Sequence, residues 1–163
     1  INISVVKSGD KSIALKVSDA HSSVNYMLSD VSVINKPPQL KEIPEFQLKI
    51  DVTPNFISKF ISGKGALSET DNFTVITDEN GTKLVIGYST VNTNRVTIPV
   101  TTSESVNIEN VSFNANIFKE VLSANKECES ATFEVSDQGL SRITFKIDDY
   151  ISTYYLVSVQ DVD

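Results

Sequence analysis

The sequence predicts an α+β fold made of duplicated β-α-β-β-β units, with the helices on one face of curved antiparallel sheets. The first observation is a repeat, because residues 55–62 (NFISKFIS) and 116–123 (NIFKEVLS) share one pattern of Asn, two apolar pairs and Ser. The second is that similar strand and turn signals follow both segments. The third is a content of 40% hydrophobic residues in 163, which is enough for a core. A repeat of this kind indicates two equivalent supersecondary units.

Residues 1–34 alternate between apolar and polar positions, which is typical of strands. Turn signals at residues 8–10 and 19–23 divide them into a three-stranded meander. This meander looks like the last three strands of a further unit, without its first strand and helix. Residues 35–45 (NKPPQLKEIPE) contain three prolines and therefore predict an extended linker.

The first complete unit begins with a predicted strand at residues 46–52. Thr53 is a suitable helix N-cap and Pro54 a suitable first helical residue, and glycine ends the helix at Gly63 or Gly65. Strands are then expected at residues 72–77, 83–88 and 94–101. Asp78-Glu79-Asn80-Gly81 predicts the hairpin turn between the first two, and Pro99 places the third at a sheet edge.

The second unit repeats this plan. A strand at residues 106–113 leads to Asn114 as N-cap and to a helix at residues 115–125. Further strands are predicted at residues 131–136, 141–147 and 152–159.

Each helix has a predicted buried stripe and an outward polar face. The stripes are Phe56, Ile57, Phe60 and Ile61 in the first helix and Ile117, Phe118, Val121 and Leu122 in the second. Four lysines then lie outward on the helices or at their ends: Lys59, Lys64, Lys119 and Lys126. They are either ordinary solvated lysines or a surface that faces phosphates, with contacts that ignore base sequence.

The composition argues against several classes of function. One histidine (His21) and one cysteine (Cys128, between two glutamates) leave little for nucleophilic catalysis or a zinc site. The segment SKFISGKG (residues 58–65) lacks the first Gly and the last Ser or Thr of a phosphate-binding loop. We therefore expect no catalytic residue, metal or cofactor. No apolar stretch is long enough to cross a membrane, and a net charge of −7 argues against whole-surface binding of nucleic acid.

The order of these elements resembles that of DNA polymerase sliding clamps, the processivity factors related to proliferating cell nuclear antigen and the tailed-phage replication clamps. The segments that carry the likeness are ATFEVSDQGLSRITFKIDDYISTYYLVSV (residues 131–159) and QLKEIPEFQLKI (residues 39–50). The resemblance implies a DNA-clamp fold. Residues 1–34 would be a partial first clamp domain, residues 35–45 the interdomain connector, and residues 46–163 the complete second domain. It also implies that the first part of a clamp subunit is missing before residue 1.

Clamps are rings, usually homotrimers, whose helices face the duplex that they encircle. The resemblance therefore implies that the two helices lie side by side beneath a continuous curved sheet and turn Lys59, Lys64, Lys119 and Lys126 toward double-stranded DNA. Glu120 on the same face is a departure from a basic lining. The implied partners are the replicative DNA polymerase and the clamp loader, with no membrane. The implied location is the cytoplasm of a phage-infected bacterial cell, or the nucleoid.

Two further surfaces follow from the resemblance. A partner peptide would dock on Leu40, Ile43, Leu140, Tyr155 and Val157, although Leu40 and Ile43 could equally serve to pin the linker down. Subunits would join by pairing residues 24–31 of one copy with residues 95–100 of the next. Tyr26, Leu28, Val96 and Ile98 would form that contact, and Pro99 fits there only outside the hydrogen-bonded register.

The alternative from another class is a β-rich structural or protein-interaction module of a virion or surface protein, which the alternating strands and net acidity also suit. The duplicated helix favours the clamp, because such a module has no reason to keep two equivalent helices with outward lysines.

Overall fold

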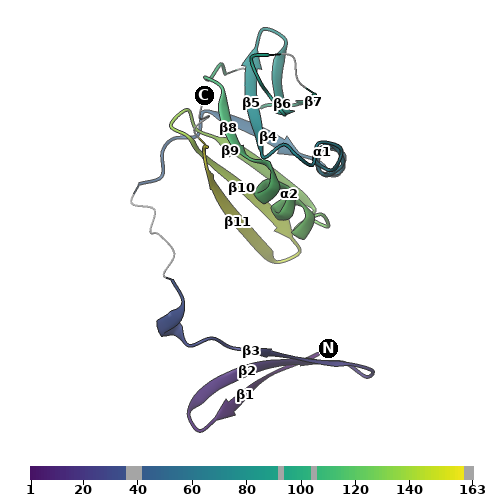
Figure 1. The fold of residues 1–163 in the computed structure, drawn as a ribbon, viewed down its shortest axis with the longest axis vertical. Helices are drawn as coiled ribbons and strands as arrows, with labels where there is room; N and C mark the ends of the chain where they lie inside the picture. Colours follow the sequence, from purple (N-terminus) through teal and green to yellow (C-terminus); the bar gives the residue numbers. More distant parts are fainter. Residues whose placement is uncertain (36–41, 92–93, 104–105, 160–163) are drawn as a thin grey trace. The chain divides into compact units, whose positions relative to one another are not determined.

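The computed structural model describes residues 1–35, 42–91, 94–103 and 106–159, which form two compact units, Ile1–Glu42 and Ile43–Asp163 (Figure 1). The first unit is an antiparallel meander of β1 (Asn2–Ser8), β2 (Lys11–Ser18) and β3 (Ser23–Met27), as predicted. Val5, Leu15 and Tyr26 form one row across it, so the apolar side chains share a face. A short 3-10 helix follows at Val31–Val33.

The second unit contains the two predicted β-α-β-β-β motifs in order. The first motif is β4 (Leu48–Val52), α1 (Pro54–Ala66), β5 (Asn72–Asp78), β6 (Gly81–Ile86) and β7 (Val96–Val100). The second is β8 (Val111–Asn114), α2 (Ala115–Ala124), β9 (Ser130–Val135), β10 (Leu140–Ile147) and β11 (Tyr150–Val157).

The two motifs exchange their first strands. One sheet has the order β11-β10-β9-β4 and the other β7-β6-β5-β8, so β4 pairs with the second motif and β8 with the first. The registers include Ile50↔Phe133 between β4 and β9 and Phe73↔Phe113 between β5 and β8. The expected single continuous sheet is therefore two four-stranded sheets. Backbone hydrogen bonds link them at two places, from Asp51 to Thr101 (3.3 Å) and from Val159 to Ser112 (2.9 Å).

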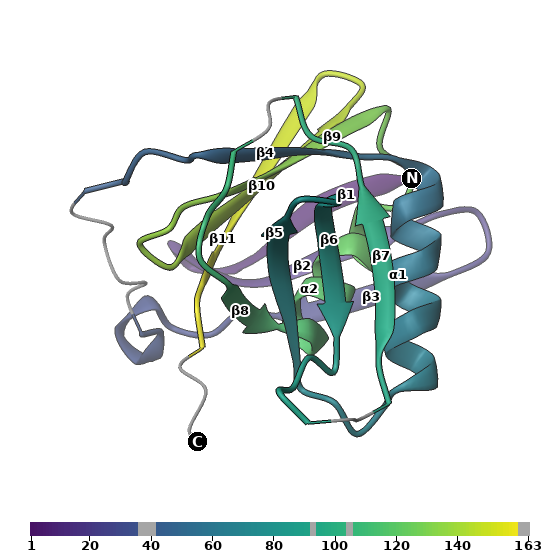
Figure 2. The ribbon, with the colours of Figure 1, turned by 90° about the horizontal axis from the view of Figure 1, so that it is seen from above.

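Local capping starts both helices where the sequence predicts. The Thr53 hydroxyl accepts from the Phe56 N–H at 3.2 Å, and the Asn114 side chain accepts from the Ile117 N–H at 2.9 Å. Helix α1 does not stop at its glycines, because it continues to Ala66. Gly63 is needed inside the helix, since a Cβ there would lie 2.8 Å from Cγ1 of Val96 on β7. Figure 2 shows β7 running alongside α1.

A cluster of phenylalanines joins both helices to both sheets. The Phe118 ring of α2 lies 4.9 Å from Phe60 of α1, 4.8 Å from Phe73 of β5 and 4.9 Å from Phe133 of β9, between ring centroids. The helices therefore lie side by side over one shared core, as the resemblance to sliding clamps implies. One predicted core residue is wrong: Ile117 is 56% exposed. The buried line of α2 runs through Ala115, Phe118 and Leu122, and Ile117 lies about 100° away from it around the helix.

Candidate functional site

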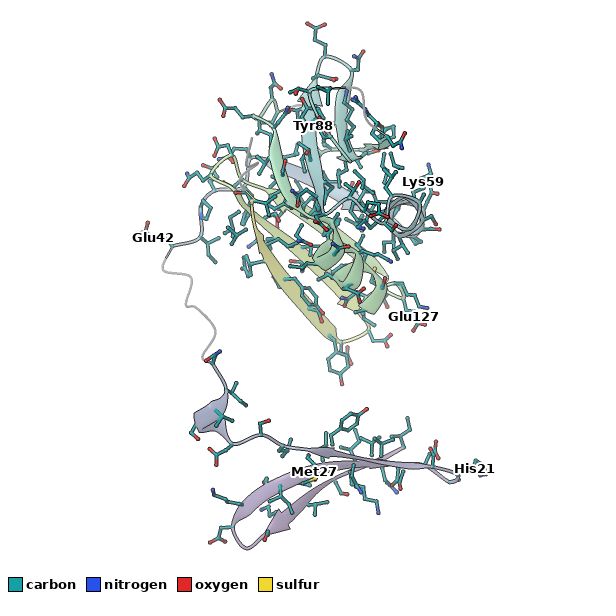
Figure 3. All side chains as sticks on the ribbon, viewed as in Figure 1. His21, Met27, Glu42, Lys59, Tyr88 and Glu127 are labelled. Atoms are coloured by element: carbon teal, nitrogen blue, oxygen red, sulfur yellow. The ribbon has the colours of Figure 1, made fainter. Side chains whose placement is uncertain are left out.

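The exposed faces of α1 and α2 form the candidate nucleic-acid interface. Lys59 is exposed on α1, and Lys119 on the neighbouring α2 is half-buried. Lys126 is exposed just beyond the C-terminal end of α2. Figure 3 shows Lys59 projecting from α1 and Glu127 lying past the end of α2. Because α1 and α2 pack against each other through Phe60 and Phe118, their polar faces are neighbours.

Lys64 does not belong to this face, which corrects the prediction. Its side chain is only 3% exposed, and its ammonium donates to the carbonyls of Leu67 (3.3 Å) and Ser68 (2.8 Å). These carbonyls follow the last turn of α1, where a cation is favoured by the helix dipole. Lys64 therefore stabilises the end of the helix and is unavailable to a phosphate.

The charges on the remaining face are mixed. Glu120 is exposed on α2, and Glu127 and Glu129 are exposed beside Lys126. Glu129 lies 3.8 Å from Lys146, in an exposed ion pair that contributes little. The three lysines thus lie among an equal number of carboxylates. Such a face supports weak, salt-sensitive contact with phosphates and no reading of base sequence.

A second candidate surface is the outer face of the sheet β11-β10-β9-β4, the face directed away from the helices. Register places Tyr155 opposite Arg142 and Arg142 opposite Glu134, and it places Val157 opposite Leu140. Ile43 and Val157 are exposed, Tyr155 is 38% exposed, and Leu140 is 8% exposed, so little of Leu140 is open to a partner. Leu40 lies outside the described residues.

Arg142 links several side chains of this outer face, and the sequence analysis did not identify it. Its Nε donates to the Glu134 carboxylate at 2.7 Å, and its guanidinium lies 4.7 Å from the centroid of the Phe46 ring. The hydrogen bond to Glu134 is the main cause that raises the pKa of Arg142 above its usual value. The sequence contained the signal, because Arg142 and Glu134 lie in two alternating strands that follow each other, where opposite charges at facing positions indicate a cross-strand pair.

The predicted subunit contact on β7 is corrected by side-chain direction. Ile98 is 3% exposed and packs in the core of its own unit, and Val96 packs against that core beside Gly63. The outward residues of β7 are Thr97 and Pro99, because side chains alternate along a strand. Tyr26 and Leu28 in the first unit are exposed.

Pro99 lies outside the hydrogen-bonded register of its strand, which the predicted subunit contact requires. The Gly87 N–H donates to Asn72 on β5 at 3.4 Å, so by alternation Lys83 also directs its backbone groups toward β5. Lys83 is the register partner of Pro99. That pair is therefore not hydrogen-bonded, and the ring nitrogen of Pro99 faces the open edge of the sheet. Within β7, only Thr97 offers an N–H to an added strand.

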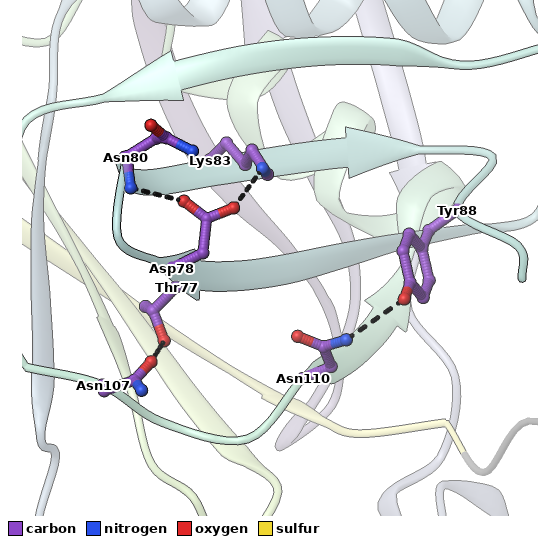
Figure 4. A network of polar contacts seen from close by, with 7 residues as sticks. All are labelled: Thr77, Asp78, Asn80, Lys83, Tyr88, Asn107 and Asn110. Carbon is purple, nitrogen blue, oxygen red and sulfur yellow. Dashed lines mark hydrogen bonds and ion pairs between the residues drawn. The ribbon is translucent and has the colours of Figure 1, made fainter.

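A polar hollow of about 370 Å³ lies beside the β5–β6 hairpin, lined in part by Thr77, Asp78 and Asn107. Figure 4 shows partners for polar groups of this lining: the Thr77 hydroxyl donates to Asn107, and Asp78 pairs with Lys83. The network ties the segment before β8 to the hairpin. It has the character of a structural contact and suggests no reaction.

The described residues contain no group of three or more His, Cys, Asp or Glu side chains that could hold a metal ion. Cys128 is buried, and burial raises the pKa of its thiol, so the thiolate is disfavoured. Among the helices in the described part of the chain, none is long and apolar enough to cross a membrane.

Comparison with known proteins identifies the fold. No family model matches the sequence, and no curated protein matches it significantly. Among solved structures, proliferating cell nuclear antigen from Entamoeba histolytica matches with a TM-score of 0.65 and 16% identity, over 95% of this chain and 62% of that one. A chain in the structure of the C-terminal region of FEN-1 bound to A. fulgidus PCNA matches with a TM-score of 0.68 and 15% identity, over 99% of this chain and 65% of that one. The chain therefore has the predicted PCNA-like sliding-clamp fold and spans less than two thirds of the length of these proteins.

Proposed function

We propose that this chain is most of a DNA sliding-clamp subunit, a non-enzymatic processivity factor that encircles duplex DNA and tethers the replicative polymerase. The observation that carries the proposal is the pairing of α1 and α2 over one core on two strand-exchanged sheets, in the fold shared with PCNA. That pairing gives one continuous polar face made of two helices, which is suited to a long cylindrical ligand.

On this proposal the duplex lies against the helix face. Lys59, Lys119 and Lys126 make loose contacts with phosphates, and Lys64 makes none. A chain of net charge −7 with a mixed-charge face binds linear DNA weakly. Retention on DNA then comes from the closed ring and not from affinity, which lets the clamp slide.

The same proposal extends to partners. The ring is a homotrimer in which β3 of one subunit pairs with the open edge of β7 in the next, through the edge-facing backbone groups of Thr97 and Pro99 more than through side chains. Polymerase and clamp loader dock on the outer face around Tyr155 and Val157. The protein then acts in the cytoplasm of a phage-infected bacterial cell or at the nucleoid. The FEN-1 complex of A. fulgidus PCNA supports a protein-binding role for this fold.

The decisive experiment loads the full-length protein onto a nicked circular plasmid with its loader and ATP, and then separates bound from free protein by gel filtration. We expect retention on the circle in about 0.2 M salt, where weak phosphate contacts alone are lost, and release after a restriction enzyme linearises the plasmid. Equal loss from circular and linear DNA would contradict the proposal and favour the structural module.

A further inference from the structure

The segment before β4 does not follow the alternation of its strand. Leu48, Ile50 and Val52 point into the core, and continuing the period of two backwards would direct Phe46 inward as well. Its ring instead lies over Arg142, whose two neighbours in β10, Ser141 and Ile143, are buried. Phe46 has therefore turned to the outer face, and the strand begins two residues later than its sequence predicts.

Arg142 holds this ring from a fixed position. The guanidinium is bonded to Glu134 on β9 at 2.7 Å, and the strand register places Tyr155 of β11 opposite Arg142, so residues from the strands on both sides of β10 flank it. Glu134 is 18% exposed and the Arg142 side chain 32%, which makes this pair better shielded than the other ion pairs of the described residues. A shielded, planar cation of this kind is well suited to stack on an aromatic ring.

Residues 43–47 have few other attachments to the sheet. The Gln47 side chain accepts from the Asp137 N–H at 3.0 Å, Pro44 is half-buried, and Ile43 is exposed. The Phe46 ring over Arg142 and the Gln47 bond to Asp137 are thus two side-chain contacts that hold this segment on the outer face.

We propose that Arg142 is a positioning residue that latches residues 43–47 onto the outer face and thereby shapes the surface that receives a partner of the clamp. Only the role in partner binding rests on the proposed function; the latch itself does not. The Glu134 carboxylate neutralises Arg142 and Phe46 covers it, so Arg142 is not available to an acidic partner, and the latched surface of Phe46, Tyr155 and Val157 favours an apolar or aromatic segment. Holding the segment in place before binding removes an ordering cost that the partner would otherwise bear.

The latch is tested by hydrogen–deuterium exchange of the full chain without any partner. Arg142→Met removes the charge and keeps the stem, and Phe46→Leu removes the ring while leaving the Arg142–Glu134 pair intact. Each is expected to speed amide exchange in residues 43–47 by about two- to fivefold, the range of an exposed cation–π contact. The double variant is expected to loosen the segment no more than the larger single effect. Lys146→Met, on the same strand and face, is the control that leaves the segment unchanged.

Unchanged exchange in residues 43–47 in both Arg142→Met and Phe46→Leu, with the protein folded, overturns the latch. The role in partner binding is tested with the fluorescein-labelled cognate DNA polymerase. Its affinity is expected to fall by about two- to fivefold in both variants and to stay constant in Lys146→Met. Binding that is equal in all four proteins overturns the partner role of the latch. A wild-type protein that does not bind the polymerase at all contradicts the proposed function and leaves the exchange result standing.

Discussion

The ring of Phe60 on α1 meets the ring of Phe118 on α2 edge-to-face, with 4.9 Å between the centroids and 85° between the planes. The two residues do not occupy equivalent places in the repeat, because Phe60 aligns with Val121 and Phe118 with Ile57. The duplicated helices therefore pack through an unequal pair of side chains. This contact decides that the two polar faces become neighbours.

Phe118→Ala is expected to lower the free energy of unfolding by about 3–5 kcal/mol, because it empties a fully buried site at the meeting of both helices and both sheets. Urea denaturation followed by circular dichroism measures the loss. In a double-mutant cycle with Phe60→Leu, the coupling energy should reach about 0.5–1.5 kcal/mol. A coupling near zero would show that the helices do not meet through these rings.

Substitution of Lys64 should affect the stability of the protein, whereas substitution of Lys59 should affect its contact with DNA. Lys64→Met is expected to destabilise the protein by about 1.5–3 kcal/mol, since it removes charged hydrogen bonds to two carbonyls, and to leave the salt dependence of DNA binding unchanged. Lys59→Met should do the reverse, lowering the slope of log affinity against log salt by about 0.9 without loss of stability. Fluorescence anisotropy with a labelled duplex and thermal denaturation provide both readouts. A changed salt slope in Lys64→Met alone would contradict this assignment.

Gly63 and Gly65 of α1 allow a matched comparison of two alanine substitutions. Gly65→Ala is expected to stabilise the protein by about 0.8–1 kcal/mol, because nothing lies near its added methyl group and alanine favours the helix. Gly63→Ala should fall below it by at least about 1 kcal/mol, because its methyl group would lie 2.8 Å from Val96. Chemical denaturation compares the two variants directly. Equal stabilisation by both would mean that β7 does not press against α1.

The thiol of Cys128 should make the free energy of unfolding decrease at alkaline pH. Burial raises the thiol pKa in the folded state, so the unfolded chain loses its proton first as the pH rises. The contribution of the thiol is therefore complete below its ordinary pKa of about 9 and is lost as the pH rises through the higher folded value. We expect Ellman's reagent to label the folded protein far more slowly than the protein in 6 M guanidinium. Cys128→Ala should flatten the stability profile above pH 9. Equally fast labelling of both states would contradict the burial.

The open edge of β7 can be altered in both directions. Pro99→Thr adds an N–H at the edge, and Thr97→Pro removes the one that β7 offers there, while neither position bonds to β6. On the proposed ring, one hydrogen bond corresponds to about a fivefold change per interface, so Pro99→Thr should tighten self-association and Thr97→Pro should weaken it. Sedimentation velocity over a range of concentrations measures both. Association that is unaffected in either variant would exclude this edge from the contact.

The sequence was sufficient to predict the contacts between residues that are close together in the chain. Thr53 and Asn114 cap helices because each bonds an N–H three residues ahead, and the β5–β6 hairpin depends on four adjacent residues ending in Gly81. Such contacts join near neighbours, so they can be read from the order of residues. The duplication also predicted two β-α-β-β-β motifs, and the resemblance predicted the clamp fold.

What only the tertiary structure decided was which neighbours each segment meets. The alternation of β4 and β8 suits either sheet, so their exchange could not be read from it. Ile117, Lys64 and Ile98 were placed wrongly because burial depends on the angle at which an element packs, which residues distant in the chain determine. Phe46 departs from the alternation of its strand because its ring packs against Arg142, almost a hundred positions later in the chain. The sequence by itself determined the elements and their polar faces, and long-range packing determined which of those faces remained open.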